Sequence, residues 1–221
     1  MRRMTFSLLG RCARTGQFGA AVTTSSIAVG TRVPFVAPGI GGVLTQHRTD
    51  PRLGPRGLDL LRSGCSAEAA LAAIVASTPD HRWRQVAVMD KDGRTAHFDG
   101  ERVKPSRSVF HGKDVVALGN ILANEDIAPA MGAAFLADPG LPLAERLVRA
   151  LEAGEAAGGE HGDVMCASLL VMDRETFPYV DLRIDHAVGP IPALRALWET
   201  YAPLADGFVK RAVEPEDAPI I

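Results

Sequence analysis

Met4-Thr5 places a threonine at the start of an apolar segment, and this threonine has the side chain of a nucleophile. If cleavage exposes the α-amine of Thr5, that amine, with a pKa of about 8, can accept the proton of the hydroxyl on the same residue. One residue then supplies both nucleophile and base for attack on an amide carbonyl. The structural alternative is that Thr5 is only the β-branched first residue of a strand, and on this feature alone that alternative is favoured.

Other polar side chains stand at predicted strand ends or helix starts, where residues commonly reach a cleft. Gln46 ends one apolar strand, Gln85 begins another, and Arg56 stands near a helix start. We take these three as candidate substrate-binding residues. For Arg56 an ion pair with Asp59 is the simpler structural explanation.

Charged residues alternate along a predicted strand at Asp181, Arg183 and Asp185. Residues two apart on a strand point to the same face, so these side chains are expected to lie together. Asp181 and Arg183 are therefore candidate substrate-binding residues in a cleft or at a subunit contact. A salt-bridge ladder explains the same spacing equally well.

No metal or cofactor site is predicted. The three cysteines are far apart and lack a Cys-x-x-Cys pair, which argues against a disulfide framework or zinc knuckle and fits a reducing cytoplasm. Glu160, His161 and Asp163 are near neighbours in a glycine-rich turn, and adjacent residues rarely point toward one ion. The sequence contains no phosphate loop or dinucleotide fingerprint.

The elements that must position the candidate residues alternate in blocks of strands and helices. Strands are expected over residues 5–9, 19–25, 41–46, 84–90, 94–98, 114–119, 165–172 and 179–184, and helices over 58–62, 66–75, 127–135, 143–154 and 191–201. Residues 33–39 contain two prolines, which favours an extended connection over a ladder interior. Helices that arrive in pairs after hairpin groups argue against a parallel sheet. The order favours an α+β fold, a four-layer sandwich of two antiparallel sheets between helices.

Length and composition set further limits. The 221 residues fit one domain, expected over 1–208, with a C-terminal tail over 209–221 in which acids and prolines alternate. A net charge of −2 makes nucleic acid or an anionic membrane surface an unlikely partner, and no apolar run is long enough to cross a membrane. With 22 glycines and only 5% aromatic residues, the chain is expected to pack sheets and helices closely through small side chains.

A series of short motifs extends along nearly the whole chain: Thr5-Phe-Ser, Val29-Gly-Thr-Arg-Val-Pro, Thr45-Gln46, Gly54-Pro-Arg-Gly-Leu-Asp-Leu-Leu61, Arg84-Gln85, Gly119-Asn120, Leu143-Ala-Glu-Arg-Leu147, Ala153-Gly-Glu-Ala-Ala-Gly-Gly159 and Val180-Asp-Leu-Arg-Ile-Asp185. Together they resemble a bacterial domain-of-unknown-function family placed in the N-terminal nucleophile (Ntn) hydrolase superfamily. The resemblance implies an αββα fold like that of penicillin acylases, γ-glutamyltransferases and proteasome subunits. It also implies Thr5 as the nucleophile and Asn120 as an amide donor to an oxyanion, although a strand-end turn explains Asn120 as well.

Two functions follow as alternatives. The first is an N-terminal-threonine amidohydrolase whose partner is a small polar amide. The second is an inactive ligand-binding or assembly protein on the same scaffold, favoured by the segment His161-Gly-Asp-Val-Met165-Cys166, where typical members carry a different sequence. Because Arg2 follows Met1, a free Thr5 requires a start at Met4 or cleavage before Thr5. A homo-oligomer is also expected, although core packing explains the apolar helix face of Trp198 and Tyr201 equally well.

Overall fold

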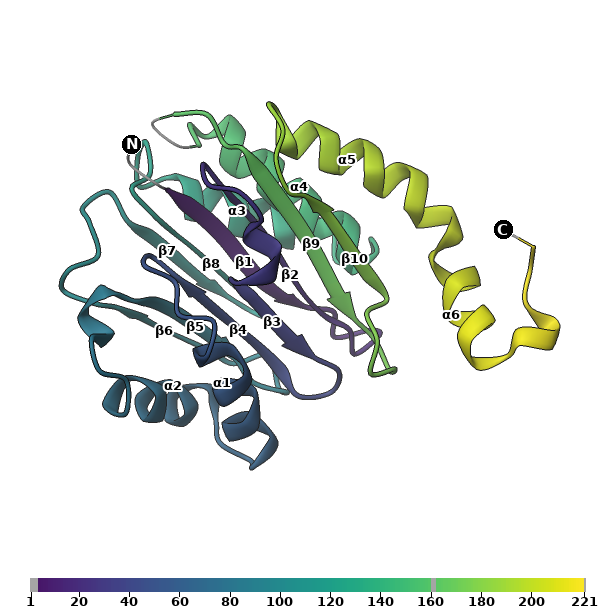
Figure 1. The fold of residues 1–221 in the computed structure, drawn as a ribbon, viewed down its shortest axis with the longest axis horizontal. Coiled ribbons are helices and arrows are strands. Elements are labelled where there is room, and N and C mark those ends of the chain that lie inside the picture. The colour runs from purple at the N-terminus through teal and green to yellow at the C-terminus, as the bar shows by residue number, and fades with distance from the viewer. Residues whose placement is uncertain (1–3, 160–161, 221) are drawn as a thin grey trace.

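The computed structural model describes residues 4–159 and 162–220, and its centre is a pair of antiparallel sheets that lie face to face (Figure 1). One sheet has six strands in the order β10-β9-β2-β1-β8-β7, and the other has four in the order β3-β4-β5-β6. The strands are β1 Thr5–Arg11, β2 Phe18–Thr24, β3 Pro34–Ala37, β4 Gly41–Gln46, β5 Gln85–Met89, β6 Thr95–Asp99, β7 Ser108–Gly112, β8 Val115–Asn120, β9 Cys166–Met172 and β10 Val180–Ile184. The first and last of them belong to the same sheet.

Helices cover the outer face of each sheet (Figure 1). α1 and α2 pack on the four-stranded sheet, and α3, α4 and α5 pack on the six-stranded one. The helices are α1 Leu53–Arg62, α2 Ala67–Ala76, α3 Ile127–Leu136, α4 Leu143–Ala156, α5 Pro190–Tyr201 and α6 Ala205–Val213. This is the α+β, four-layer αββα arrangement that the sequence predicts.

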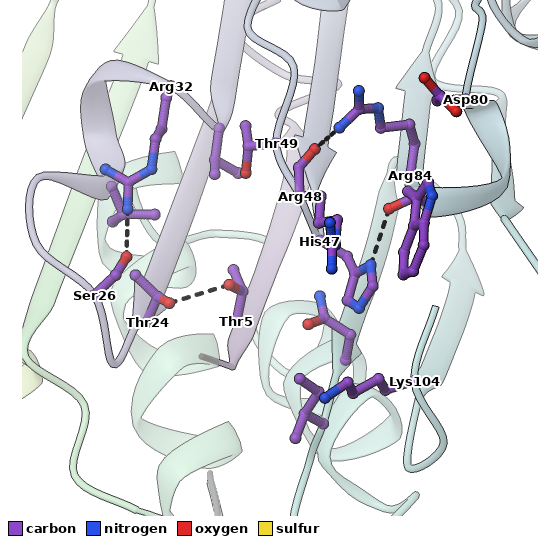
Figure 2. A pocket seen from close by; sticks show the side chains of 15 residues that line it. Thr5, Thr24, Ser26, Arg32, His47, Arg48, Thr49, Asp80, Arg84 and Lys104 are labelled. Atoms are coloured by element: carbon purple, nitrogen blue, oxygen red, sulfur yellow. Dashed lines mark hydrogen bonds between the residues drawn. The ribbon is translucent and has the colours of Figure 1, made fainter. Parts of the chain in front are cut away.

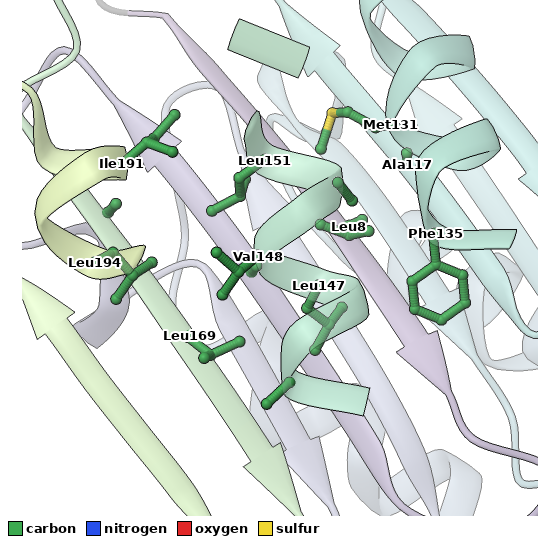
Figure 3. Close-up of a cluster of buried hydrophobic side chains, with 14 of the residues drawn as sticks. Leu8, Ala117, Met131, Phe135, Leu147, Val148, Leu151, Leu169, Ile191 and Leu194 are labelled. Carbon is green, nitrogen blue, oxygen red and sulfur yellow. The ribbon is translucent and has the colours of Figure 1, made fainter. Parts of the chain in front are cut away.

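The core has three apolar layers, one between each sheet and its helices and one between the two sheets. Because side chains alternate along a strand, the six-stranded sheet contributes to two of these layers. Leu8 of β1 points to the helices and packs with Leu147 and Leu169 in the layer under α3, α4 and α5 (Figure 3). Its neighbour Leu9 points the other way and packs with Leu44 of β4 between the sheets. Because both faces of β1 are covered, the strand is buried from Thr5 to Gly10, and only Arg11 at its end is partly exposed.

Glycine allows the layers to approach closely, as the composition predicts. A Cβ atom on Gly42 of β4 would lie 2.7 Å from Cδ2 of Leu9 on the facing sheet. On the helix side, a Cβ atom on Gly10 would lie 2.5 Å from Cε2 of Phe135, which is fully buried. Both distances are shorter than any normal carbon–carbon contact, so a larger residue would force the layers apart.

The sequence prediction missed some elements and misplaced others. Pro34 begins a short edge strand, β3, where the missing proline N–H costs no ladder bond. β7 is a half-buried edge strand without an apolar run, and α6 begins before the expected tail boundary at residue 209. α4 continues past Gly154 to Ala156, because that glycine is packed against Met131 inside the helix layer.

Two further observations concern surfaces. Trp198 of α5 is 5% exposed and belongs to the core cluster between the helices and the six-stranded sheet, so core packing accounts for the apolar face of α5.

Among the helices of the described residues, none combines the length and the apolar character needed to span a bilayer.

Candidate active site

A pocket of about 770 Å³ opens at the end of the sandwich where several strands meet (Figure 2). β1 begins there at Thr5, β2 ends at Thr24, and β8 ends at Asn120. Neighbouring strands are antiparallel, so the start of one lies beside the ends of the next. The pocket is lined by Thr5, Thr24, Ser26, Val29, Arg32, Val33, His47, Arg48, Thr49, Asp80, Trp83, Arg84, Lys104, Asn120 and Ile121.

Thr5 lies at the junction of two ladders, paired in register with Thr24 on one side and Asn120 on the other. Its side chain is largely buried, with the residue 9% exposed, and its hydroxyl donates to the Thr24 hydroxyl at 3.1 Å. The Thr24 hydroxyl in turn donates to the carbonyl oxygen of Met4. A continuous chain of hydroxyl protons therefore joins the Thr5 side chain to the amide bond that precedes it.

Asn120 is held by Gln85 of the facing sheet, and Gln46 of the same sheet in turn holds Gln85. Nδ2 of Asn120 donates to Oε1 of Gln85 at 2.9 Å, and Nε2 of Gln46 donates to the same oxygen at 2.6 Å. Oε1 of Gln46 accepts from the hydroxyl of Ser7 at 2.7 Å. Gln46, Gln85 and Asn120 are all buried, and the two glutamines support the pocket without lining it.

The orientation of these amides follows from two acceptors. Nε2 of Gln85 donates to Oδ1 of Asp99 at 2.8 Å and to the carbonyl oxygen of Gly119 at 3.1 Å. A carbonyl can only accept, so the nitrogen of Gln85 must face Gly119 and its oxygen must face Asn120. Asn120 therefore directs Nδ2 toward Gln85, and this nitrogen keeps a second N–H for another acceptor.

His47 follows β4 directly and lines the pocket, and the sequence analysis did not single it out. Its Nδ1 lies 2.9 Å from the carbonyl oxygen of Trp83, so Nδ1 carries the proton and Nε2 has a free lone pair. Burial lowers the pKa of His47, and the nearby charges of Arg48 and Lys104 act in the same direction. A neutral imidazole that can accept a proton thus faces the pocket. The signal that could have found it is the polar run after β4, which begins at Gln46.

The backbone around the pocket adopts unusual conformations. His47, Arg48, Asp80 and Ile121 have φ values of 51°, 50°, 59° and 58°, in the left-handed region that non-glycine residues rarely adopt. All four line the pocket. Such conformations cost on the order of 1 kcal/mol or more each and persist where the surrounding structure imposes them, which is typical of functional sites.

The structure places the remaining predicted residues outside this pocket. Arg56 lies on α1 and bonds to the carbonyl and hydroxyl of Ser77 on the outer side of the four-stranded sheet. Its guanidinium therefore bonds to the end of α2, and the ion pair expected with Asp59 is made by Arg62 instead.

Asp181 and Arg183 lie on the edge strand β10, where they form a two-point ion pair at 2.8 and 2.7 Å. The spacing did bring the two side chains together, as the sequence predicts. It forms the salt bridge that was the structural alternative, and neither residue lines the pocket.

Within residues 4–159 and 162–220, no group of three or more His, Cys, Asp or Glu side chains is arranged to hold a metal ion. Glu160 and His161 lie outside the described residues. The thiol of Cys166, beside the pocket, donates to the carbonyl of Ser26 at 2.8 Å.

The fold and site together define a four-layer α+β sandwich with a polar, threonine-containing pocket at one end of its strands. The chain belongs to the Family of unknown function (DUF1028), whose sequence model matches residues 5–194. It is similar to protein SPO2555 from Silicibacter pomeroyi, a DUF1028 protein of known structure, with 31% identity and a TM-score of 0.84 over 90% of this chain and 86% of that one. The motifs therefore identified a family of unknown function correctly.

A second solved structure, Anbu (ancestral beta-subunit) from Yersinia bercovieri, aligns with a TM-score of 0.43 and 9% identity over 98% of this chain and 99% of that one. No curated protein is significantly similar to the chain.

Proposed function

We propose that the protein is an N-terminal-threonine amidohydrolase that cleaves an amide bond in a small polar substrate. The observation that carries this proposal is the position of Thr5, whose hydroxyl lies in a polar pocket at the first position of a central strand. The motif resemblance to Ntn hydrolases supports the same residue as nucleophile. In this mechanism the free α-amine of Thr5 accepts the proton of its own hydroxyl as the oxygen attacks the substrate carbonyl.

The α-amine must first be released from its amide bond to Met4, and the hydroxyl chain supports a route. Oγ1 of Thr5 attacks the carbonyl carbon of Met4, the Thr5 hydroxyl proton passes to Thr24, and the proton of Thr24 passes to the oxygen of Met4. The intermediate collapses by breaking the C–N bond: its hydroxyl proton moves to the leaving nitrogen, and an ester links Met4 to Oγ1 of Thr5. Water then hydrolyses the ester to a carboxylate on Met4 and a free Thr5.

In the proposed reaction with substrate, the tetrahedral intermediate carries negative charge on the former carbonyl oxygen. Asn120 is paired in register with Thr5, and its Nδ2 keeps one N–H beyond the bond to Gln85. We assign that N–H to the oxyanion, a role in which one donor typically contributes about 100-fold or more to the rate. Gln46 and Gln85 are then positioning residues that fix Asn120.

Intact-mass measurement on the protein expressed in its own host, combined with assays on Thr5→Ala and Thr5→Ser, tests this proposal. The expected result is a chain that begins at Thr5, hydrolysis of small N-acyl amides, loss of hydrolysis in Thr5→Ala and partial retention in Thr5→Ser. A chain that keeps the residues before Thr5 and hydrolyses none of these amides would contradict it.

A second candidate function is a non-catalytic binding or assembly protein. The observation that favours it is the buried position of Met4, whose N–H donates to the hydroxyl of Ser25 at 3.1 Å while its carbonyl accepts from Thr24. Both groups stabilise the uncleaved chain. Turnover that requires the Thr5 hydroxyl would exclude this candidate.

A further inference from the structure

One side of the pocket carries three cations, and two of them form no ion pair with a carboxylate of the described residues. We define the cationic wall as Arg48, Arg84 and Lys104, all of which line the pocket. The chain as a whole has a net charge of −2, so this concentration is local and does not reflect a basic protein. Among the described residues, the lining includes one carboxylate, Asp80, which lies 3.8 Å from the guanidinium of Arg82.

Arg48 and Lys104 have no carboxylate within ion-pair distance in the described part of the chain. The guanidinium carbon of Arg48 lies 4.0 Å from the ring centroid of Trp83, and this contact orients the cation without cancelling its charge. The charge of Arg48 therefore lies against an aromatic ring that also lines the pocket.

Arg84 is a partly buried member of the wall. Its side chain is 17% exposed and donates to the carbonyl of Arg48, which fixes the backbone of that residue. The nearest carboxylate, Asp50, lies 3.9 Å away and already forms two 2.8 Å bonds with Arg52. The Nε of Arg84 is buried with no hydrogen-bond partner among the described residues. An unpaired buried donor of this kind is costly unless a ligand or solvent satisfies it.

Some cations outside the pocket are paired. Arg195 forms ion pairs with Glu145 and Glu152, and Arg11 forms one with Asp114, although the Nε of Arg11 is also buried with no hydrogen-bond partner among the described residues. Burial is the main cause of the lowered pKa of His47, and the charges of Arg48 and Lys104 lower it further because they lie near the same imidazole.

We infer that the pocket binds substrates that carry an anionic oxygen group, such as a carboxylate, with that group on the cationic wall and the scissile amide at Thr5. The inference rests on the proposed function for the identity of the reacting bond. It adds a substrate class: acidic amides in preference to neutral amides of the same size. Guanidinium and ammonium groups recognise such oxyanions through charge-assisted hydrogen bonds.

Matched substrate pairs provide the kinetic test. Glutaryl p-nitroanilide and pentanoyl p-nitroanilide differ only in a terminal carboxylate in place of a methyl group on the acyl side. N-acetyl-β-alanine and its primary amide differ in a carboxylate in place of a neutral carboxamide on the amine side. We expect the acidic member of at least one pair to have a kcat/KM about tenfold or more above that of its neutral partner, since one charge-assisted bond is worth that much. Arg48→Gln and Lys104→Gln should each reduce this preference. The controls Arg62→Gln and Lys210→Gln, which remove one charge outside the pocket, should not.

Binding to Thr5→Ala separates this inference from the proposed function. Glutarate should bind more tightly than its neutral diamide by calorimetry, and Arg48→Gln in the same background should weaken glutarate at least about fivefold. Glutarate binding without hydrolysis of any amide would overturn the proposed function but support the anionic ligand class. Equal hydrolysis of acidic and neutral amides, or glutarate binding unaffected by Arg48→Gln, would overturn the inference.

Discussion

Thr5 and Thr24 face each other across the β1–β2 ladder, with their hydroxyl oxygens 3.1 Å apart, and the second hydroxyl donates to the carbonyl that precedes the first. This relationship connects a nucleophile to the bond that blocks its amine. It follows from register alone, because an antiparallel pair places the first residue of one strand opposite the last residue of the next.

Replacement of Thr24 by valine removes the hydroxyl that joins Thr5 to the Met4 carbonyl while keeping the shape of the side chain. If the proposed route is correct, Thr24→Val should slow release of the residues before Thr5 by about 100-fold, the usual contribution of positioned proton transfer. The measurement is a time course of intact mass after expression. Thr23→Val is the matched control, because its hydroxyl bonds to the carbonyl of Cys166 and does not line the pocket. Equal processing in both variants would exclude a role for Thr24.

The lowered pKa of His47 predicts a pH dependence of stability. Above the ordinary value of 6.5 the imidazole is neutral in both states, so it has no effect. As the pH falls below 6.5, the unfolded chain binds a proton that the folded chain resists, so the free energy of unfolding decreases until the pH passes below the lowered pKa. His47→Asn should flatten this decrease, measured by urea denaturation between pH 7 and about pH 5. Asparagine tolerates the left-handed backbone found at this position.

A second histidine contributes with the same sign and serves as the comparison. Burial and the neighbouring His97 lower the pKa of His111, which lies outside the pocket. His111→Asn should also flatten the slope, but only His47→Asn should change the pH dependence of amide hydrolysis. If His111→Asn changes the pH dependence of hydrolysis equally, the effect is not specific to the imidazole that lines the pocket.

Gln85 connects the two sheets beneath the pocket, so its loss should destabilise the fold as well as the site. Gln85→Ala leaves the buried amides of Gln46 and Asn120 and the carbonyl of Gly119 short of partners. We expect a loss of about 3 kcal/mol in the free energy of unfolding, because each unsatisfied buried group costs on the order of 1 kcal/mol or more. Chemical denaturation measures it. Gln17→Ala in the β1–β2 turn should change stability by less than about 0.5 kcal/mol, and a similar effect of both variants would refute the network.

The ion pair between Asp181 and Arg183 lies away from the pocket, and its removal should therefore leave catalysis intact. Asp181→Asn should change kcat/KM less than about twofold and stability by less than about 1 kcal/mol, as is typical of a partly exposed ion pair. A selective loss of activity in a stably folded Asp181→Asn variant would indicate that Asp181 contributes to substrate binding.

Local patterns predicted the strands and the layers, and they also placed the residues at the strand ends. Thr5 was a candidate from its place at the start of a strand, the family resemblance implied both Thr5 and Asn120, and the structure brings the two residues together in one pocket. Gln46 and Gln85 were candidate substrate-binding residues because of their places at strand ends. Their role as buried supports depends on the distance between the two sheets, which no local pattern contains.

The cations and His47 could not be predicted, because they reach the pocket through loops. Arg48, Asp80 and Ile121 owe their positions to left-handed backbone conformations that the surrounding structure imposes. Arg56 was predicted to bind substrate because it stands near a helix start. That position does not determine which side of α1 carries the side chain, and the guanidinium bonds to Ser77 instead. β7 lacks the apolar alternation on which strand predictions rest, whereas α6 has a helical apolar pattern at Ala205, Phe208 and Val209 that the expected tail boundary at residue 209 divided.

The two ends of the chain are not equivalent as sites for added sequence. Thr5 begins a central strand at the pocket, whereas α6 lies on the far side of the molecule, beyond β10 and α5 (Figure 1). A purification tag fused before Met4 would extend the segment that blocks the amine of Thr5. A tag that follows α6 in the sequence would be attached on the side of the molecule away from the nucleophile, and the chain could be immobilised on a surface through that side with its pocket open to solution.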